Sequence, residues 1–243
     1  MTTPLPAAVA RHPHLAAPQR SGWVRVDLHS HTMWSGDSTT TPDEIEQSVV
    51  EAGIDVLCIT DHHAVRGGAE LARRLPCRVV VGEEMRTHAG ELIGLFLTDR
   101  VPAGTSAAVA AQAIREQGGI VYVPHPFDPM RRNLAESALY ELARAGLVDA
   151  VEVLNAKTSL PSLNRRAAEF AAEFDLAAGA GSDAHVPDAI GAAFVEMPDF
   201  DGPVEFLARL RDAVVVGHHW DEPRAWRPRI VPSAIHHEHP PVT

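Results

Sequence analysis

Short apolar runs recur along the chain from residue 23 to residue 217, and polar segments with helical spacing separate most of them. The runs predict β-strands at residues 23–29, 55–60, 78–84, 91–97, 119–125, 149–155, 176–183, 192–197 and 213–217. Several are apolar at nearly every position. Nearly continuous apolar strands that alternate with helices are typical of a parallel sheet with both faces covered.

The clearest helix prediction covers residues 42–52. Thr41 has the position of an N-cap, Glu44 that of its capping-box partner, and Pro42 that of the first helical residue. An apolar stripe and a terminating glycine follow, at Ile45, Val49, Ala52 and Gly53.

A second helix is predicted at residues 134–145. Its start and stop residues are Asn133, Glu136 and Gly146, and its inward positions are Leu134, Leu139 and Leu142. The number of strand–helix units favours a closed or nearly closed barrel, with an open doubly wound sheet as the alternative. We expect a single α/β domain over residues 22–220, an N-terminal arm at 1–21 and a Pro/His-rich tail at 221–243. The arm histidines, His12 and His14, are expected to be solvated.

Composition narrows the setting. Hydrophobic residues make up 45% of the 243-residue chain, and no apolar run reaches the roughly 20 residues of a membrane helix. The N-terminus lacks the apolar segment of a signal peptide, so we expect a cytoplasmic protein. The formal net charge of −11 disfavours a stable partnership with long nucleic acid. Cys58 and Cys77 adjoin apolar runs and are expected to be buried thiols.

Polar residues with metal-binding chemistry stand where the predicted strands end. The strand ends read "DLHSH", "CITDHH", "VVVGEE", "YVPHP", "EVLNAK" and "GAGSDAH". In a barrel the carboxyl ends of the strands meet at one face, where catalytic residues collect. We therefore expect these side chains to converge on one site.

Spacing selects the inward-facing members of this set. His29 and His31 are two residues apart in a strand, as are Asp183 and His185, so the two side chains of each pair point to the same side. Neighbours such as His62 and His63 diverge, and we take His62 as the inward one. The other candidates are Asp37, which alone would be a turn residue, Glu84, one of two acids after a strand, and His125, which lies between two prolines.

These motifs in this order, "DLHSH" with Asp37, "TDHH", "GEE", "PHP" and "GSDAH", resemble the PHP (polymerase and histidinol phosphatase) family over roughly residues 24–220. The resemblance implies a distorted TIM-like (β/α)7 barrel, a two- or three-metal site and phosphoesterase activity. Position by position, it implies these metal ligands: His29, His31, Asp37, His62, Glu84, His125, Asp183 and His185.

The sequence departs from the family pattern in two places. "TDHH" stands where "TDHD" is usual, which puts His63 at a position that is commonly acidic. In "THAGELIGLFL", Glu91 takes the place of a ligand histidine found in many relatives. We expect Glu91 to be a substitute carboxylate ligand, with His88 as the alternative.

A set of imidazoles and carboxylates without thiolates suits zinc, manganese or iron as the two or three divalent ions that the resemblance implies. Such ions polarise phosphate and lower the pKa of a bound water. Asp61 is expected to orient a ligand histidine or a water. His125 or His185 could protonate the leaving group, although metal ligation would compete with that role. For substrate binding we favour Arg131, which is also suited to phosphate contact during catalysis, and Lys157, with Asn155 behind them.

These features predict hydrolysis of a phosphate ester of a small metabolite, a nucleotide or a short oligonucleotide. The alternatives are an amidohydrolase-like enzyme that cleaves a C–N bond, whose barrel would also begin with His-x-His, and a non-catalytic metal-binding module.

Overall fold

The computed structural model describes residues 7–220 of the chain. The predicted tail at 221–243 lies outside the described residues. All nine predicted strands are confirmed. They are β1 (Trp23–Ser30), β2 (Val56–Ile59), β3 (Arg78–Thr87), β4 (Gly90–Leu95), β5 (Ile120–Val123), β6 (Ala150–Asn155), β7 (Ala177–Gly181), β8 (Ala193–Pro198) and β9 (Val214–Gly217).

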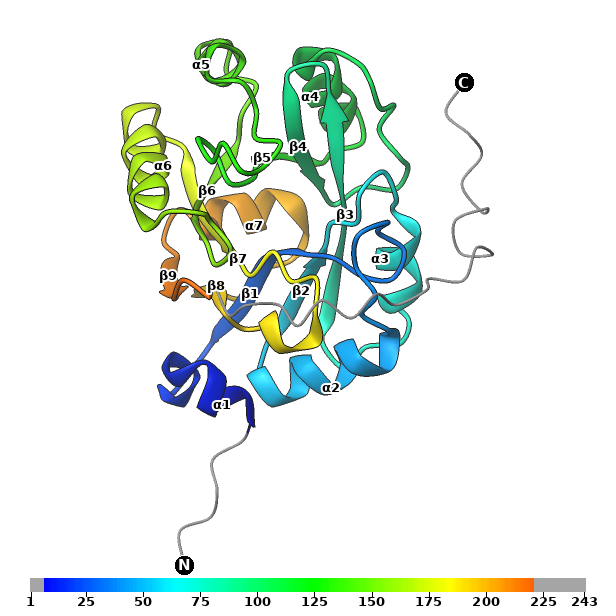
Figure 1. Ribbon diagram of the computed structural model, residues 1–243, viewed down its shortest axis with the longest axis vertical. Helices are drawn as coiled ribbons and strands as arrows, with labels where there is room; N and C mark the ends of the chain where they lie inside the picture. Colours follow the sequence, from blue (N-terminus) through cyan, green and yellow to red (C-terminus); the bar gives the residue numbers. More distant parts are fainter. Residues whose placement is uncertain (1–6, 221–243) are drawn as a thin grey trace, which may run out of the picture.

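The strands form one curved sheet in the order β7-β6-β5-β4-β3-β2-β1-β8-β9. The sheet nearly closes, because the segment after β7 returns to the end of β1. The backbone N–H of Asp183 donates to the carbonyl of His29 (2.8 Å), and that of His31 donates to the carbonyl of Ala184 (2.9 Å). Strands β1–β7 therefore make a distorted seven-stranded barrel, and β8 and β9 extend the sheet beyond β1 (Figure 1).

The expectation of a parallel sheet is wrong for β4, inside the barrel, and for β8 and β9, which extend the sheet beyond β1. Strand β4 runs antiparallel to both β3 and β5, and β8 runs antiparallel to β1. No helix separates β3 from β4, and a connection this short permits only a hairpin. As a result the first residues of β4, not the last, lie at the end of the barrel where the other strands finish.

Helices cover the outside of the strands (Figure 1). They are α1 (Ala7–Arg11), α2 (Pro42–Ala52), α3 (Arg66–Leu71), α4 (Ala107–Glu116), α5 (Glu136–Arg144), α6 (Pro161–Glu173) and α7 (Gly202–Leu210), with short 3-10 turns η1 (Pro13–Ala16) and η2 (Pro187–Ala189). None of the helices within residues 7–220 is both long and apolar enough to cross a membrane.

The sequence predicts α2 to the residue. Thr41 and Glu44 form the capping box, and Gly53 ends the helix in the left-handed conformation at φ 63°. Helix α5 starts two residues later than predicted. The Asn133 side chain donates to the carbonyl of Leu134 and does not cap the helix, while Leu134 is buried ahead of its first turn.

The expectation that His12 and His14 are solvated is wrong. Ala8 and Leu15 pack into the apolar cluster beneath α2, and His12 is fully buried. His12 Nε2 donates to the carbonyl of Asp188 (2.8 Å), and His14 Nε2 donates to that of Gly191 (2.8 Å). This arm therefore holds the connection between β7 and β8 in place.

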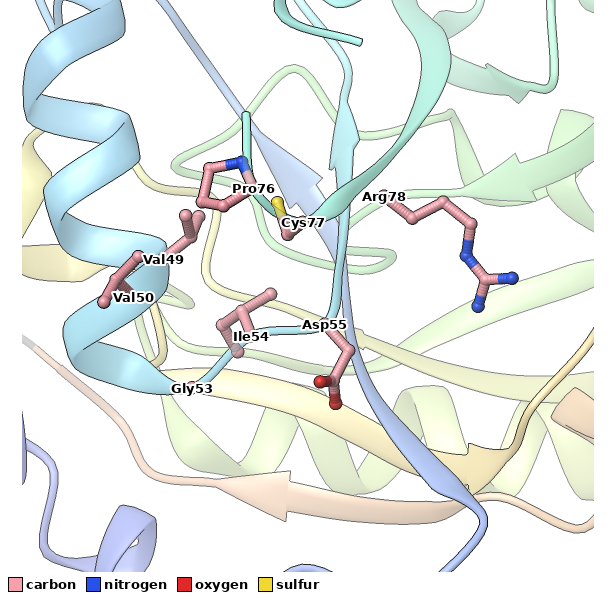
Figure 2. Close-up of a pocket in the computed structure, with 8 residues that line it drawn as sticks. All are labelled: Val49, Val50, Gly53, Ile54, Asp55, Pro76, Cys77 and Arg78. Carbon is pink, nitrogen blue, oxygen red and sulfur yellow. The ribbon is translucent and has the colours of Figure 1, made fainter. Parts of the chain in front are cut away.

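A shallow depression of about 230 Å³ lies at the opposite end of the barrel, where β2 and β3 begin (Figure 2). Its charged groups are already paired: Asp55 accepts from the backbone of Arg25, and Arg78 pairs with Asp199. Cys77 lines this depression and is half-buried, whereas Cys58 is fully buried in the barrel as expected; both are free thiols. We therefore regard the depression as part of the structural surface and not as a binding site.

Candidate metal centre

Nine side chains with metal-binding chemistry converge at the end of the barrel where β1, β2, β5, β6 and β7 finish. They form four overlapping groups whose ligand atoms lie within 4.8 Å of one another. The groups are His29/His31/Glu84, His29/His125/Asp183, Glu84/Glu91/His125 and His31/Asp37/His62/His185. These are the nine residues that the sequence and the family resemblance indicated, and we call them the nine-residue cluster.

His29, in β1, and His31, which follows β1, lie at the centre of the cluster, and neither ring is exposed to solvent. The alternation of a strand puts both on the inner side, with their Nε2 atoms 3.0 Å apart. Glu84 Oε2 lies 3.3 Å from His29 Nε2 and 3.2 Å from His31 Nε2. Asp183 Oδ1 approaches the same two nitrogens at 3.8 and 3.6 Å.

Glu84 connects two of the groups. Its Oε2 faces His29 and His31, while its Oε1 lies 3.1 Å from Nε2 of His125. A carboxylate whose two oxygens face different sets of ligands is suited to bridging two cations. Glu84 reaches this position because β3 runs past the end of β2 and carries Glu84 beside Asp61 and His62.

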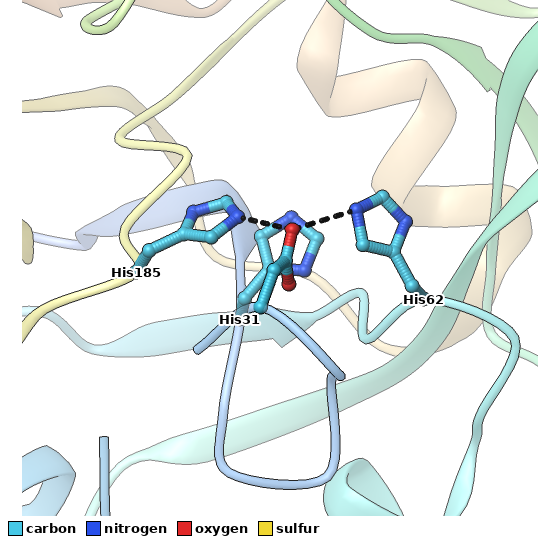
Figure 3. A group of neighbouring side chains, drawn as sticks. His31, His62 and His185 are labelled. Atoms are coloured by element: carbon cyan, nitrogen blue, oxygen red, sulfur yellow. Dashed lines mark hydrogen bonds and ion pairs between the residues drawn. The ribbon is translucent and has the colours of Figure 1, made fainter. Parts of the chain in front are cut away.

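The group of His31, His62 and His185 surrounds Asp37, which lies in the loop between β1 and α2. Figure 3 shows the rings of His31, His62 and His185 converging from three different segments. Asp37 Oδ2 lies 3.0 Å from Nε2 of His185 and 3.2 Å from Nε2 of His62. Ser35 donates to Asp37 Oδ1 at 2.8 Å and holds the carboxylate in this place.

Glu91 joins the cluster because β4 is antiparallel. It lies at the start of β4, opposite Arg86 on β3, and is 4% exposed. Arg86 Nε lies 3.3 Å from Glu91 Oε1. Burial, with the nearby charge of Glu84, raises the pKa of Glu91. The alternative ligand, His88, is exposed and belongs to none of the four groups.

The charge state of the metal-free cluster fits cation binding. Burial lowers the pKa of His29, but the carboxylates of Glu152, Asp183 and Glu84 outweigh it and raise that pKa well above its usual value. Burial and the neighbouring His185 lower the pKa of His31 to about 3. A proton on His29 thus supplies positive charge among buried acids, as a metal ion would.

The spacing of the ligand atoms fits as well. Ligands that bind one ion at about 2.1 Å stand roughly 3.0–3.4 Å apart. The contacts of His29, His31 and Glu84 measure 3.0–3.3 Å, and two facing imidazole nitrogens can share only one proton. The residues present therefore suit divalent cations at more than one position.

Two members of the cluster stand on unusual backbone. His125 has φ 28° and Asp183 has φ 50°, in a region that residues other than glycine seldom adopt. Such conformations persist only where the surroundings hold them. Here the backbone N–H of His125 donates to Glu152 (2.6 Å), and that of Asp183 donates to His29 (2.8 Å).

The side chain of Asp61 bonds to the loop after β1. Both of its oxygens accept hydrogen bonds from Thr32, from the backbone N–H at 2.6 Å and from the hydroxyl at 2.7 Å. Burial raises the pKa of Asp61 to about 6, against these hydrogen bonds. Asp61 therefore holds the loop after β1 and is not hydrogen-bonded to a ligand histidine, while its expected role in orienting a water stays a prediction.

The three residues expected to bind substrate differ in whether a substrate can reach them. Arg131 lines the cavity of the cluster, with its guanidinium 3.6 Å from Asp183. Lys157 Nζ lies 3.3 Å from Asp183 Oδ1 and 2.8 Å from His185 Nδ1. Asn155 is fully buried and donates to Glu152 and Asp183, so a substrate cannot reach it and its expected role in substrate binding is wrong.

Sequence reasoning missed Glu152, which stands in the middle of β6 and is fully buried. Its Oε1 lies 3.1 Å from Nδ1 of His29 and its Oε2 accepts from the backbone of His125. This is the ligand-orienting role that was expected of Asp61. A carboxylate inside the apolar run "AVEVL" was the signal that could have revealed it.

The cavity over the cluster has a volume of about 170 Å³. Besides cluster members it is lined by Met130 and by three arginines, Arg86, Arg131 and Arg132. Arg86 and Arg132 were not among the predicted site residues. Arginines beside a set of cation ligands can hold the peripheral oxygens of an anionic substrate.

Comparison with known proteins agrees with this geometry. Residues 27–122 match the PHP domain and residues 161–215 the PHP-associated domain. An uncharacterized protein of Methanocaldococcus jannaschii is 36% identical over 197 residues, which cover 77% of this chain and 79% of the relative.

Solved structures share the fold. One is a two-domain protein from Bacteroides vulgatus that contains a predicted PHP-like metal-dependent phosphoesterase, with 19% identity, a TM-score of 0.64 and coverage of 83% of this chain and 67% of that one. Another is an amidohydrolase from Chromobacterium violaceum with bound sulfate and no metal, with 17% identity, a TM-score of 0.54 and coverage of 67% and 88%.

Proposed function

Because this chain belongs to the PHP family, we propose that it is a metal-dependent phosphoesterase that hydrolyses a phosphate ester of a small metabolite, a nucleotide or a short oligonucleotide. The observation that carries the proposal is the convergence of nine side chains with metal-binding chemistry in four overlapping groups beside three arginines. Several cations and a basic rim suit an anionic ester better than a neutral substrate.

Different residues of the chain would bind the metal ions and the phosphate. The four groups would hold two or three divalent ions, with Glu84 as the bridging carboxylate. Such ions, when bound, polarise the phosphate and make a coordinated water more acidic. Manganese, iron and zinc all fit a set of imidazoles and carboxylates. Arg131 would bind a phosphate oxygen, and Lys157 would add positive charge beside Asp183.

Of the two histidines considered for proton transfer to the leaving group, we favour His185. Both rings are largely buried, 8% exposed for His185 and 4% for His125. The neighbour of His185 is Asp37, whose side chain is 47% exposed, whereas His125 faces the buried Glu84. His185 therefore stands closer to the solvent side, where a leaving group departs.

The size and charge of the site support a small substrate. A cavity of about 170 Å³ has room for a phosphate and little of the group attached to it, so the remainder of the substrate would extend into solvent. A chain with a net charge of −11 attracts no long polyanion, but the end of a short oligonucleotide could reach the arginines.

Hydrolysis of a C–N bond is the alternative, and the fold shared with an amidohydrolase supports it. The arginines beside the cluster favour the phosphate ester, because a neutral amide offers no anionic oxygen for them to bind. A non-catalytic metal-binding module is less consistent with a cavity that adjoins the ligands.

The test is hydrolysis of a chromogenic phosphate monoester and diester by protein reconstituted separately with Mn, Fe or Zn. We expect release of the chromophoric alcohol from the ester, which stops on chelation and is absent in His29→Ala and Asp183→Ala; both variants should also lose bound metal. No release from either ester with any of the three metals would count against a phosphoesterase. Sugar phosphates, nucleotides, nucleoside bisphosphates, short oligonucleotides and amides would then identify the substrate class.

A further inference from the structure

Two loops on one side of the cavity carry the basic groups nearest to Asp183. The loop between β5 and α5 carries Arg131, and the loop between β6 and α6 carries Lys157. The guanidinium of Arg131 donates to the carbonyl of Lys157 (3.0 Å), so the two residues are in direct contact. Both basic groups also approach Asp183, at 3.6 and 3.3 Å.

Asp128 joins these loops. Its side chain is fully buried, and each of its oxygens accepts two hydrogen bonds. Oδ1 accepts from the backbone of Met130 (3.0 Å) and from the hydroxyl of Ser159 (2.6 Å). Oδ2 accepts from the backbone of Ser159 (2.7 Å) and from the hydroxyl of Thr158 (3.2 Å).

These contacts bracket the basic residues in sequence. Met130 immediately precedes Arg131, and Thr158 immediately follows Lys157. The backbone N–H of Arg131 also donates to the carbonyl of Asp128 (3.1 Å). One carboxylate therefore restrains the backbone next to both basic side chains. Hydrogen bonds to a charged acceptor are stronger than neutral ones, so the restraint depends on the charge of Asp128.

The start of this loop has an unusual backbone conformation. Phe127, next to Asp128, has φ 68°, which strains a residue that carries a side chain. Phe127 is held by stacking of the Arg166 guanidinium, 4.0 Å from its ring centroid, and by Phe170. The segment after Phe127 contacts the neighbouring loop through three hydrogen bonds of Asp128 and one of Arg131.

We propose that Asp128 is a positioning residue that sets Arg131 and Lys157 for the phosphate group of the substrate. The inference rests on the proposed function. Asp128 is buried and contacts no member of the nine-residue cluster through its side chain, so it acts on substrate binding through the two loops. His125 contacts Glu84 through its ring and Glu152 through its backbone, and neither contact involves the side chain of Asp128.

The test compares Asp128→Asn and Asp128→Ala with the parent protein in the metal-loaded state. We expect KM for a phosphate ester, and the Kd for inorganic phosphate, to rise together by about tenfold in the alanine variant, while kcat changes less than about threefold and metal content stays constant. Asp212→Asn, at an exposed position before β9, is the matched control and should leave all four quantities unchanged.

A double-mutant comparison isolates the mechanism. In an Arg131→Ala/Lys157→Ala background, Asp128→Ala should add less than about a twofold rise in KM, because the groups it positions are absent. An equal rise in both backgrounds, or a fall in kcat accompanied by metal loss, would overturn the inference. If Asp128→Ala does not fold, Ser159→Ala, which removes one of the four contacts, should raise the Kd for phosphate two- to threefold; an unchanged Kd would also overturn it.

Calorimetric binding of inorganic phosphate separates this inference from the proposed function, since it needs no turnover. A parent protein that hydrolyses no ester, yet binds phosphate more tightly than Asp128→Ala does, would refute the activity and support the role of Asp128. A metal-loaded parent that binds no phosphate would refute both.

Discussion

Oε1 of Glu152 lies 3.1 Å from Nδ1 of His29, inside the barrel and directly beneath the nine-residue cluster. Oε2 of the same carboxylate accepts a hydrogen bond of 2.6 Å from the backbone N–H of His125. One buried acid thus orients two members of the nine-residue cluster, His29 through its ring and His125 through its backbone. With Nδ1–H of His29 directed at Glu152, Nε2 keeps its lone pair for a cation.

We predict that Glu152→Gln lowers metal affinity by about tenfold and Glu152→Ala by up to about a hundredfold. The amide keeps the shape but presents N–H groups where His125 and Asn155 donate. Titration with a chromophoric competitor for the metal would measure the affinities. Glu116→Gln, on the exposed side of α4, is the control; equal affinities in Glu152→Ala and this control would contradict the prediction.

Glu91 is predicted to hold an ion through its carboxylate. Glu91→Gln should lower the metal content by about one ion per chain and reduce turnover at least tenfold, because a neutral amide oxygen is a weaker ligand. Elemental analysis after dialysis would measure the metal content. Arg86→Gln removes the ion pair with Glu91 but leaves the carboxylate, so it should retain every ion. Full metal content in Glu91→Gln would show that Glu91 is not a ligand.

Gly181, at the end of β7, leaves the space in which His29 and Glu152 meet. A Cβ atom there would lie 2.4 Å from Cβ of His29 and 2.7 Å from Glu152 Oε1. We expect Gly181→Ala to lower the free energy of unfolding by about 1–3 kcal/mol and to weaken metal binding, because both side chains must shift. Urea unfolding and metal titration measure the two effects. Gly36→Ala, whose Cβ would have no neighbour within 4 Å, should change stability far less.

His12 should make stability depend on pH. Burial lowers its pKa from 6.5 to about 4, so the folded protein keeps the neutral ring where the unfolded chain would already be protonated. The stabilisation is complete above pH 6.5 and is lost as pH falls from 6.5 towards 4. The expected loss is about 1–3 kcal/mol.

Thermal unfolding between pH 8 and 4 would reveal this contribution. His12→Gln should show a shallower loss of stability across that interval than the parent protein. Parallel profiles of the two proteins would rule out the assigned role of His12. His88→Gln, which replaces an exposed histidine, serves as the control.

Local patterns in the sequence were sufficient for the strands and for α2. Every strand run appears as a strand, and α2 has its predicted ends, because its capping box and final glycine act within a few residues. The start of α5 was wrong by two residues, since the backbone of Ala135 bonds instead to the distant carbonyl of Ala89. That contact depends on tertiary packing, which no local pattern reports.

The cluster members could be named because strand alternation, and the order of motifs that resembles the PHP family, select them from the chain. Their assignment as metal ligands stays a prediction. The roles of their buried neighbours could not be predicted. Asp61 and Glu152 are both acids beside apolar runs, and only the packed structure shows that Asp61 is bound to Thr32 and Glu152 to His29.

The sequence by itself therefore determined the strands, helix α2 and the residues with metal-binding chemistry, because these depend on local spacing and side-chain type. The tertiary structure decided that β4 is antiparallel and brings Glu91 to the cluster, that Asn155 is sealed from solvent, and that Asp128 joins two loops. Each of these depends on which segments distant in sequence pack together. That packing is set by the free energy of the whole chain and not by any local pattern.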